Sequence, residues 1–215
     1  MPSSPRTEKH TLMPHASTHP AQSPQSGARS SFTVYVLVAL TTLLADLVSK
    51  EAATVALGSD RVVPLLERLS LMLVYNTGSA GGVMIGPYTW HVNVLATAAA
   101  ILLITSAAKA LIAVDRRATL ALGLVAGGAA GNLASMLLGP EGVADFLAIA
   151  LGADTTIVVN GADLALWAGA LLLMPVGVSL VNAIRAEHRG VRRVERRGTG
   201  RAHTYGGVER RALAA

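Results

Sequence analysis

Long runs without a charged residue are the feature that most restricts how this chain can fold. Residues 69–108, 118–140 and 164–184 contain no Asp, Glu, Lys or Arg. A helix of about 20 apolar residues is long enough to cross the roughly 30 Å hydrocarbon core of a bilayer. Charged residues make up 14% of the chain, against about 25% in a typical soluble domain. The sequence therefore predicts an all-α membrane protein and excludes a soluble enzyme.

Four transmembrane helices account for the apolar pattern. We expect them at about residues 32–49, 90–108, 118–138 and 161–184. Between the first two, the stretch VVPLLERLSLMLVYN has short β-prone pieces around Pro64. These pieces predict a small extramembrane sheet, called here the β-cradle. A second extramembrane loop is expected at residues 139–159.

The composition divides the chain into three parts. Residues 1–31 are rich in Ser, Pro, His and Thr and lack apolar periodicity, which predicts a disordered tail. Residues 32–184 make up the four-helix membrane domain. Residues 185–215 hold nine Arg against three Glu, which predicts a basic disordered tail.

Charge predicts the orientation in the membrane. Basic residues exceed acidic ones in both tails and in the loop 109–117, whereas residues 140–159 hold three acids and no base. Because cytoplasmic flanks carry the excess of Lys and Arg, both termini should face the cytoplasm of a cell inner membrane. The formal charge of +5 is thus explained by topology and contact with membrane lipids. No recognition module accompanies it, so we expect no nucleic acid partner.

Few ionisable residues lie in or beside a span, and such residues are functional candidates by default. Asp46 and Lys50 lie at the end of the first span, Asp145 lies in the second loop, and Asp163 opens the fourth span. Two facing carboxylates cannot both ionise cheaply, so one is charged and can activate water while the other keeps a proton. Asp145 and Asp163 could therefore carry out acid–base peptide hydrolysis.

Simpler interpretations of the same residues stay open. Asp46 could be an interfacial acid paired with Lys50, four positions along one helix face. Asp163 could cap the fourth helix, and Asp145 could be a solvated loop acid. The chain has no cysteine, and His91 is the one histidine near a span. We therefore expect no metal and no other cofactor.

Four short blocks occur in order along the chain. They are DLVSK at 46–50, YNTGSAGG at 75–82, GGAAGNLASMLLG followed by GVADF at 127–146, and VVNGAD at 158–163. Together they resemble the conserved blocks of the lipoprotein signal peptidases, or signal peptidase II, in which an aspartic protease site is carried by four transmembrane helices. The resemblance covers about residues 46–163 and adds to the matching topology.

The resemblance implies a role for each matched residue. Asp145 and Asp163 correspond to the catalytic aspartates of the family. The residues that would line or support the substrate site are Asn76, Gly78, Asn132, Asn160, Asp46 and Lys50. The family removes the signal peptide of prolipoproteins just before a cysteine that bears a diacylglyceryl group. Such prolipoproteins would be the substrates, and we expect the protein to act as a monomer.

The chain also departs from the family pattern. The family usually continues its Gly-Asn block with an Asp-Arg pair, and this chain has Ser135 and Met136 in place of that pair. Gly81 and Val159 stand where the family usually has Phe. A catalytically weakened or inactive lipoprotein-binding relative of the same fold is therefore an alternative. A small transporter subunit is a further one, but it would place acids at mid-membrane depth.

Overall fold

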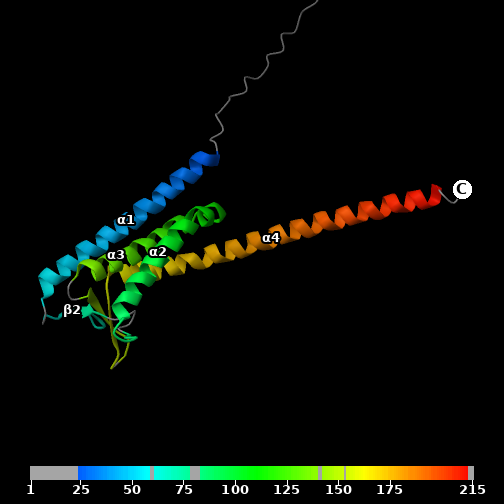
Figure 1. Cartoon of the computed structure of the whole chain (residues 1–215). Coiled ribbons are helices and arrows are strands. Elements are labelled where there is room, and N and C mark those ends of the chain that lie inside the picture. Colours follow the sequence, from blue (N-terminus) through cyan, green and yellow to red (C-terminus); the bar gives the residue numbers. More distant parts are fainter. Residues whose placement is uncertain (1–23, 59–60, 78–82, 140–141, 153, 213–215) are drawn as a thin grey trace, which may run out of the picture.

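A computed structural model describes residues 24–58, 61–77, 83–139, 142–152 and 154–212, with side chains from 31 to 189. It contains four helices long and apolar enough to cross a membrane. They are α1 (Pro24–Leu57), α2 (Thr89–Val114), α3 (Ala118–Leu138) and α4 (Gly161–Ala212), shown in Figure 1. The predicted all-α membrane fold with four spans is confirmed.

Three helices are longer than the spans predicted for them. Helix α1 begins at Pro24 rather than near residue 32 and ends at Leu57 rather than near residue 49. Helix α2 continues past residue 108 to Val114, and α4 continues past residue 184 to Ala212. In Figure 1 the last part of α4 projects away from the bundle. Hydropathy marks where a helix leaves an apolar medium, whereas Arg, Glu and Ala favour continuing the helix in water. The tail boundaries at 31 and 185 mark changes in composition and stay predictions.

Helix α3 is the centre of the bundle and packs against α1, α2 and α4. Small residues permit this, because a Cβ at Gly127 would overlap the carbonyl oxygen of Ala39 in α1. A Cβ at Gly131 would likewise overlap the carboxylate of Asp46. The glycines of α3 thus allow backbones to approach closely, as is common between helices in membranes.

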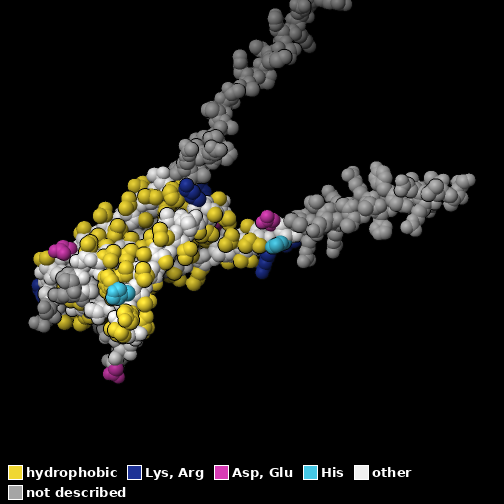
Figure 2. Space-filling view, in the orientation of Figure 1, with side chains coloured by type: hydrophobic (Ala, Val, Ile, Leu, Met, Phe, Trp, Pro, Cys, Tyr) yellow, Lys and Arg dark blue, Asp and Glu magenta, His cyan; other side chains and the backbone are white. Residues whose placement is uncertain are grey.

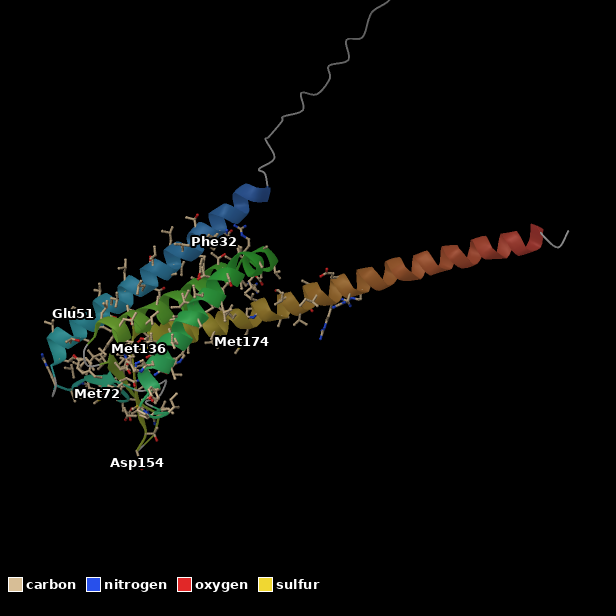
Figure 3. The ribbon with its side chains drawn as sticks, in the orientation of Figure 1. Phe32, Glu51, Met72, Met136, Asp154 and Met174 are labelled. Atoms are coloured by element: carbon tan, nitrogen blue, oxygen red, sulfur yellow. The ribbon has the colours of Figure 1, made fainter. Side chains whose placement is uncertain are left out.

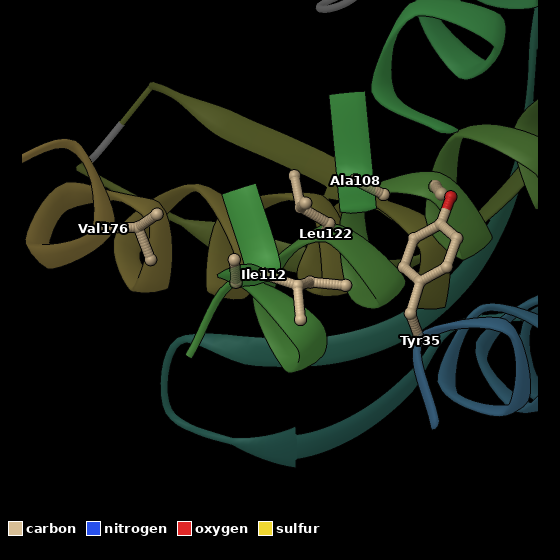
Figure 4. Close-up of a cluster of buried hydrophobic side chains, with 7 residues drawn as sticks. Tyr35, Ala108, Ile112, Leu122 and Val176 are labelled. Carbon is tan, nitrogen blue, oxygen red and sulfur yellow. The ribbon is translucent and has the colours of Figure 1, made fainter. Parts of the chain in front are cut away.

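The apolar core lies toward the end of the bundle away from the sheet. Tyr35, Ala108, Ile112, Leu122 and Val176 come from all four helices and are buried together (Figure 4). Most other large apolar side chains point outward instead, and they cover the visible face of the bundle in Figure 2. An apolar exterior around a tightly packed small-residue centre is the pattern expected of a bundle surrounded by lipid.

The β-cradle is a four-stranded antiparallel sheet in the order β1-β2-β3-β4. Its strands are β1 (Val63–Leu66), β2 (Leu69–Asn76), β3 (Val143–Ala150) and β4 (Thr156–Val159). The first hairpin is the predicted one. The second hairpin corrects the expectation of a loop at 139–159. Its strands include Val, Ile, Phe and Thr, which suit a pleated surface. Strand β3 pairs with β2 from Val143 to Ile149, with one register shift between Leu71 and Val74.

Candidate functional site

Asp145 is placed by the β-cradle. It lies on β3, opposite Val74 of β2, and its side chain is buried. Gly142, just before the strand, has φ +109° and lies so close to the Asn76 carbonyl that a Cβ would not fit. This glycine lets the chain turn into β3 beside β2. Asp145 is therefore not the solvated loop acid of the simpler interpretation.

Asp163 belongs to the first turn of α4 and forms a reciprocal cap with Asn160. The backbone N–H of Asn160 donates to Oδ2 of Asp163 over 3.1 Å, and the backbone N–H of Asp163 donates to Oδ1 of Asn160 over 3.0 Å. This is the geometry of a capping box. The predicted capping role is thus present. It uses only one carboxylate oxygen of Asp163 and leaves Oδ1 facing the bundle.

Two asparagines connect the acids. Nδ2 of Asn160 donates to Oδ1 of Asp145 over 2.6 Å and to Oδ1 of Asn132 over 3.2 Å. Nδ2 of Asn132 in turn donates to Oδ1 of Asp163 over 3.0 Å. Asp145 and Asn160 are buried, whereas Asp163 and Asn132 are partly exposed. The structure therefore brings together an acid on strand β3 and an acid on helix α4. The side-chain amides of the two asparagines lie between them.

Burial controls the acidity of Asp145. It raises the pKa of the Asp145 carboxyl from 3.8 to about 6. The hydrogen bond from Asn160 lowers this pKa, the negative charge of Asp163 raises it, and a hydrogen bond with the Asn76 side chain lowers it again. Acid–base chemistry needs two neighbouring carboxyls of different acidity. Asp145, which keeps its proton up to about pH 6 beside Asp163, meets this need.

Asp46 and Lys50 form a buried ion pair that contacts Asn132 and the start of α4. Nζ of Lys50 lies 2.7 Å from Oδ2 of Asp46. Lys50 also donates to Oδ1 of Asn132 over 2.8 Å and to Oγ of Ser135 over 3.1 Å. Oδ1 of Asp46 accepts the backbone N–H of Ala162, at the start of α4, over 2.7 Å. The predicted pairing of Asp46 with Lys50 on one helix face exists, and both side chains are buried in the bundle.

Residues 38–178 match the model of a protein family described as Signal peptidase (SPase) II, Peptidase_A8. The chain belongs to the signal peptidase II family. The match covers all four blocks on which the resemblance was based and supports a peptidase of lipoprotein precursors. Among curated proteins, none matches the sequence at a significant level.

Solved structures share the fold. One bacterial membrane enzyme has a TM-score of 0.56 and 22% identity, covering 70% of this chain and 88% of its own. A second, also a bacterial membrane enzyme, has a TM-score of 0.55 and 21% identity, covering 66% of this chain and 90% of its own. Their likeness to this signal peptidase II family member extends to the arrangement of the helices and sheet.

The departure from the family blocks lies beside the site. Ser135 accepts its hydrogen bond from Lys50 and donates to the carbonyl of Gly131 over 3.0 Å. The carbonyl of Met136 accepts the indole N–H of Trp90, at the start of α2, over 3.1 Å. Figure 3 shows Met136 in the same end of the bundle as Met72 of the β-cradle, far from Phe32. Neither the Lys50–Ser135 contact nor the Trp90–Met136 contact has a signal in the sequence.

Three residues singled out in the sequence remain to be placed. Asn76 lies at the end of β2 and contacts Asp145, as described above. Gly78 lies outside the described residues. The ring of His91 lies edge-on to the rings of Tyr88 and Trp90 at the start of α2. Within the described ranges, no three His, Asp or Glu side chains gather as a metal site would require.

Proposed function

We propose that this protein is an aspartic endopeptidase that removes the signal peptide from diacylglyceryl-modified prolipoproteins. The observation that carries the proposal is the single amide of Asn160, which contacts Asp145 directly and joins Asp163 through a reciprocal cap. Acids separated by 18 residues in sequence are thereby held as a pair. Membership of the signal peptidase II family supports the same reaction class.

The chemistry follows from the different surroundings of the two acids. Asp145, whose pKa is raised to about 6, holds the shared proton. Asp163 is partly exposed and takes a proton from a water molecule, which attacks the scissile carbonyl carbon. Asp145 donates its proton to the carbonyl oxygen as the tetrahedral intermediate forms. The proton taken by Asp163 passes to the leaving amine, the C–N bond breaks, and Asp145 recovers its proton from the hydroxyl of the intermediate.

The position of the acids suits a substrate that enters from the bilayer. They lie where α4 begins and the β-cradle meets the bundle, at the opposite end from the basic α2–α3 turn. With the basic segments in the cytoplasm, this end faces outward from the inner membrane. The signal peptide and the lipid chains would lie beside the apolar helices, and the bond to be cut would lie at the membrane surface. The proposed reaction needs no metal or organic cofactor.

A non-catalytic lipoprotein-binding relative is the second candidate, and the Ser135–Met136 pair favours it. Loss of a charged pair near the site would affect substrate handling. The hydrogen-bonded network nevertheless closes without that pair, since no buried side-chain nitrogen or oxygen in the described part of the chain lacks a partner. A transporter subunit is disfavoured because Asp163 lies at the first turn of its helix, not at mid-membrane depth.

A processing assay separates the candidates. The full chain in membranes is given a diacylglyceryl-modified prolipoprotein, and conversion to the shorter form is followed by gel mobility and mass. The proposal predicts conversion by the unmodified protein and precursor accumulation with Asp163→Asn. The matched control is Asp115→Asn, which removes an acid from the α2–α3 turn. If the unmodified protein binds several authentic precursors but converts none of them, the chain is the non-catalytic lipoprotein-binding relative.

A further inference from the structure

The amide of Asn132 has two ends of similar shape but opposite hydrogen-bonding character. Its NH₂ can only donate and its oxygen can only accept. In the structure Nδ2 faces the carboxylate of Asp163 at 3.0 Å. Reversing the amide would aim its oxygen at that carboxylate, which would be repulsive. Something must therefore fix the amide in its present orientation.

Lys50 faces the other end of this amide. Its ammonium group has three N–H donors and no acceptor, and Nζ lies 2.8 Å from Oδ1 of Asn132. If the amide reversed, two donors would face each other inside the bundle. The amide of Asn160 also donates to Oδ1 of Asn132, over 3.2 Å. Two donors on one oxygen thus impose a single orientation.

The ammonium itself is held by a complete set of partners. Its remaining donors reach Asp46 at 2.7 Å and Ser135 at 3.1 Å. Lys50 is 5% exposed and Asp46 is 1% exposed, so the charge pair is shielded from water. Oδ1 of Asp46 also accepts the backbone N–H of Ala162, next to Asp163. The lysine of the pair therefore contacts Asn132, and the aspartate contacts the start of α4.

We propose that Lys50 is a positioning residue for the aspartate pair, whose ammonium, balanced by Asp46, orients the Asn132 amide so that its NH₂ faces Asp163. Lys50 itself does not contact either acid of the pair. The charge of Lys50 also lowers the pKa of Asp145 directly, but its orienting effect passes through Asn132. This orienting effect separates the idea from a general contribution of the ion pair to stability. The inference rests on the proposed peptidase function, because it concerns the same two acids.

A double-mutant cycle tests the inference. Asp46→Asn with Lys50→Met removes both charges together, which avoids leaving a buried charge alone. Asn132→Leu removes the amide through which Lys50 would act. Misplaced catalytic groups lower rates by roughly 100-fold, so D46N/K50M should lower kcat for processing of a diacylglyceryl-modified prolipoprotein by about 10- to 100-fold and change KM little. In the N132L background the same two substitutions should change kcat by less than about threefold, because coupled residues are not additive.

Two further variants keep the test decisive. Asp46→Asn with Lys50→Gln keeps an N–H donor near Asn132, so it should retain more kcat than D46N/K50M, and it replaces that variant if the methionine form does not fold. Tyr35→Phe removes a partly buried hydrogen bond of 2.9 Å to Thr105, between α1 and α2. This control should lower the thermal midpoint in detergent without lowering kcat.

The outcomes are distinct. If D46N/K50M lowers kcat equally with and without the Asn132 amide, the positioning role is overturned. The ion pair would then only stabilise the bundle. A Gln variant no better than the Met variant would overturn it too. Asp163→Asn is assayed alongside: if it remains active, the proposed function fails whatever the cycle shows. If it is inactive while the cycle is additive, only the positioning role fails. An inert unmodified protein would overturn both.

Discussion

Nδ2 of Asn160 lies 2.6 Å from Oδ1 of Asp145, and this hydrogen bond joins the start of α4 to strand β3. The same asparagine caps α4 by accepting the backbone N–H of Asp163 at its Oδ1. One side chain therefore fixes both acids relative to each other. The strand sets the position of one carboxylate and the helix sets the position of the other.

Asn160→Ala should therefore reduce processing strongly. The substitution removes the cap on Asp163 and the donor to Asp145, and losing a donor at a reacting centre lowers kcat by roughly 100-fold or more. Loss of the cap alone destabilises a protein by about 1 kcal/mol, so the variant should still fold. Initial rates on a model prolipoprotein measure the effect. A variant that keeps more than half of the normal rate would contradict the bridging role.

The rate should fall as pH rises through about 6. Asp145 holds its proton below its pKa of about 6, and above that pH it loses the proton that the proposed reaction uses. Because the hydrogen bond with Asn76 lowers this pKa, Asn76→Ala should move the falling limb to higher pH. Profiles of kcat/KM against pH for both proteins give the comparison. If the falling limb moved to lower pH in N76A, Asp145 would not be the acid that titrates in this profile.

Asp145→Asn should stabilise the fold while it abolishes the activity. Burial raises the pKa of Asp145 above 3.8, so the unfolded chain releases this proton at lower pH than the folded chain does. Stability contributed by this group is thus lost between about pH 4 and pH 6 and stays lost above it. The introduced amide would be neutral in both states, and its oxygen could still accept from Asn160. The thermal midpoint in detergent at pH 7 should rise, and an equal or lower midpoint would contradict the assignment of a buried acid whose charge is unfavourable.

Gly131→Ala should destabilise the bundle, whereas Gly177→Ala should not. A Cβ at Gly131 would overlap the carboxylate of Asp46, but a Cβ at Gly177 in α4 would have no heavy atom within 4 Å. Overpacking of this kind destabilises by roughly 1–3 kcal/mol, while Ala in place of a helical Gly is favourable by about 1 kcal/mol where space allows. Thermal unfolding of the two variants in the same detergent compares them. Equal midpoints would show that α1 and α3 can separate without loss.

The sequence predicts the spans well because the membrane imposes a simple rule of length and charge. It also predicts the Asp46–Lys50 pair, since residues four apart share a helix face. It does not predict that Asp46 accepts the N–H of Ala162, 116 positions away, because that contact depends on how α1 and α4 pack around α3. The strand at Asp145 escapes prediction for a related reason. Its acid suggests a loop, and only pairing with β2 makes the neighbouring apolar residues a buried strand.

The proposed reaction depends on Asp145 and Asp163 acting as one catalytic unit, and the double variant measures this most directly. Asp145→Asn, Asp163→Asn and the combination are compared for single-turnover processing of one diacylglyceryl-modified prolipoprotein in membranes. Members of a catalytic unit are strongly non-additive, so each single variant should lose roughly a thousandfold or more of the rate and the double variant should lose little beyond that. Substantial activity in either single variant, or losses that multiply in the double variant, would contradict the account.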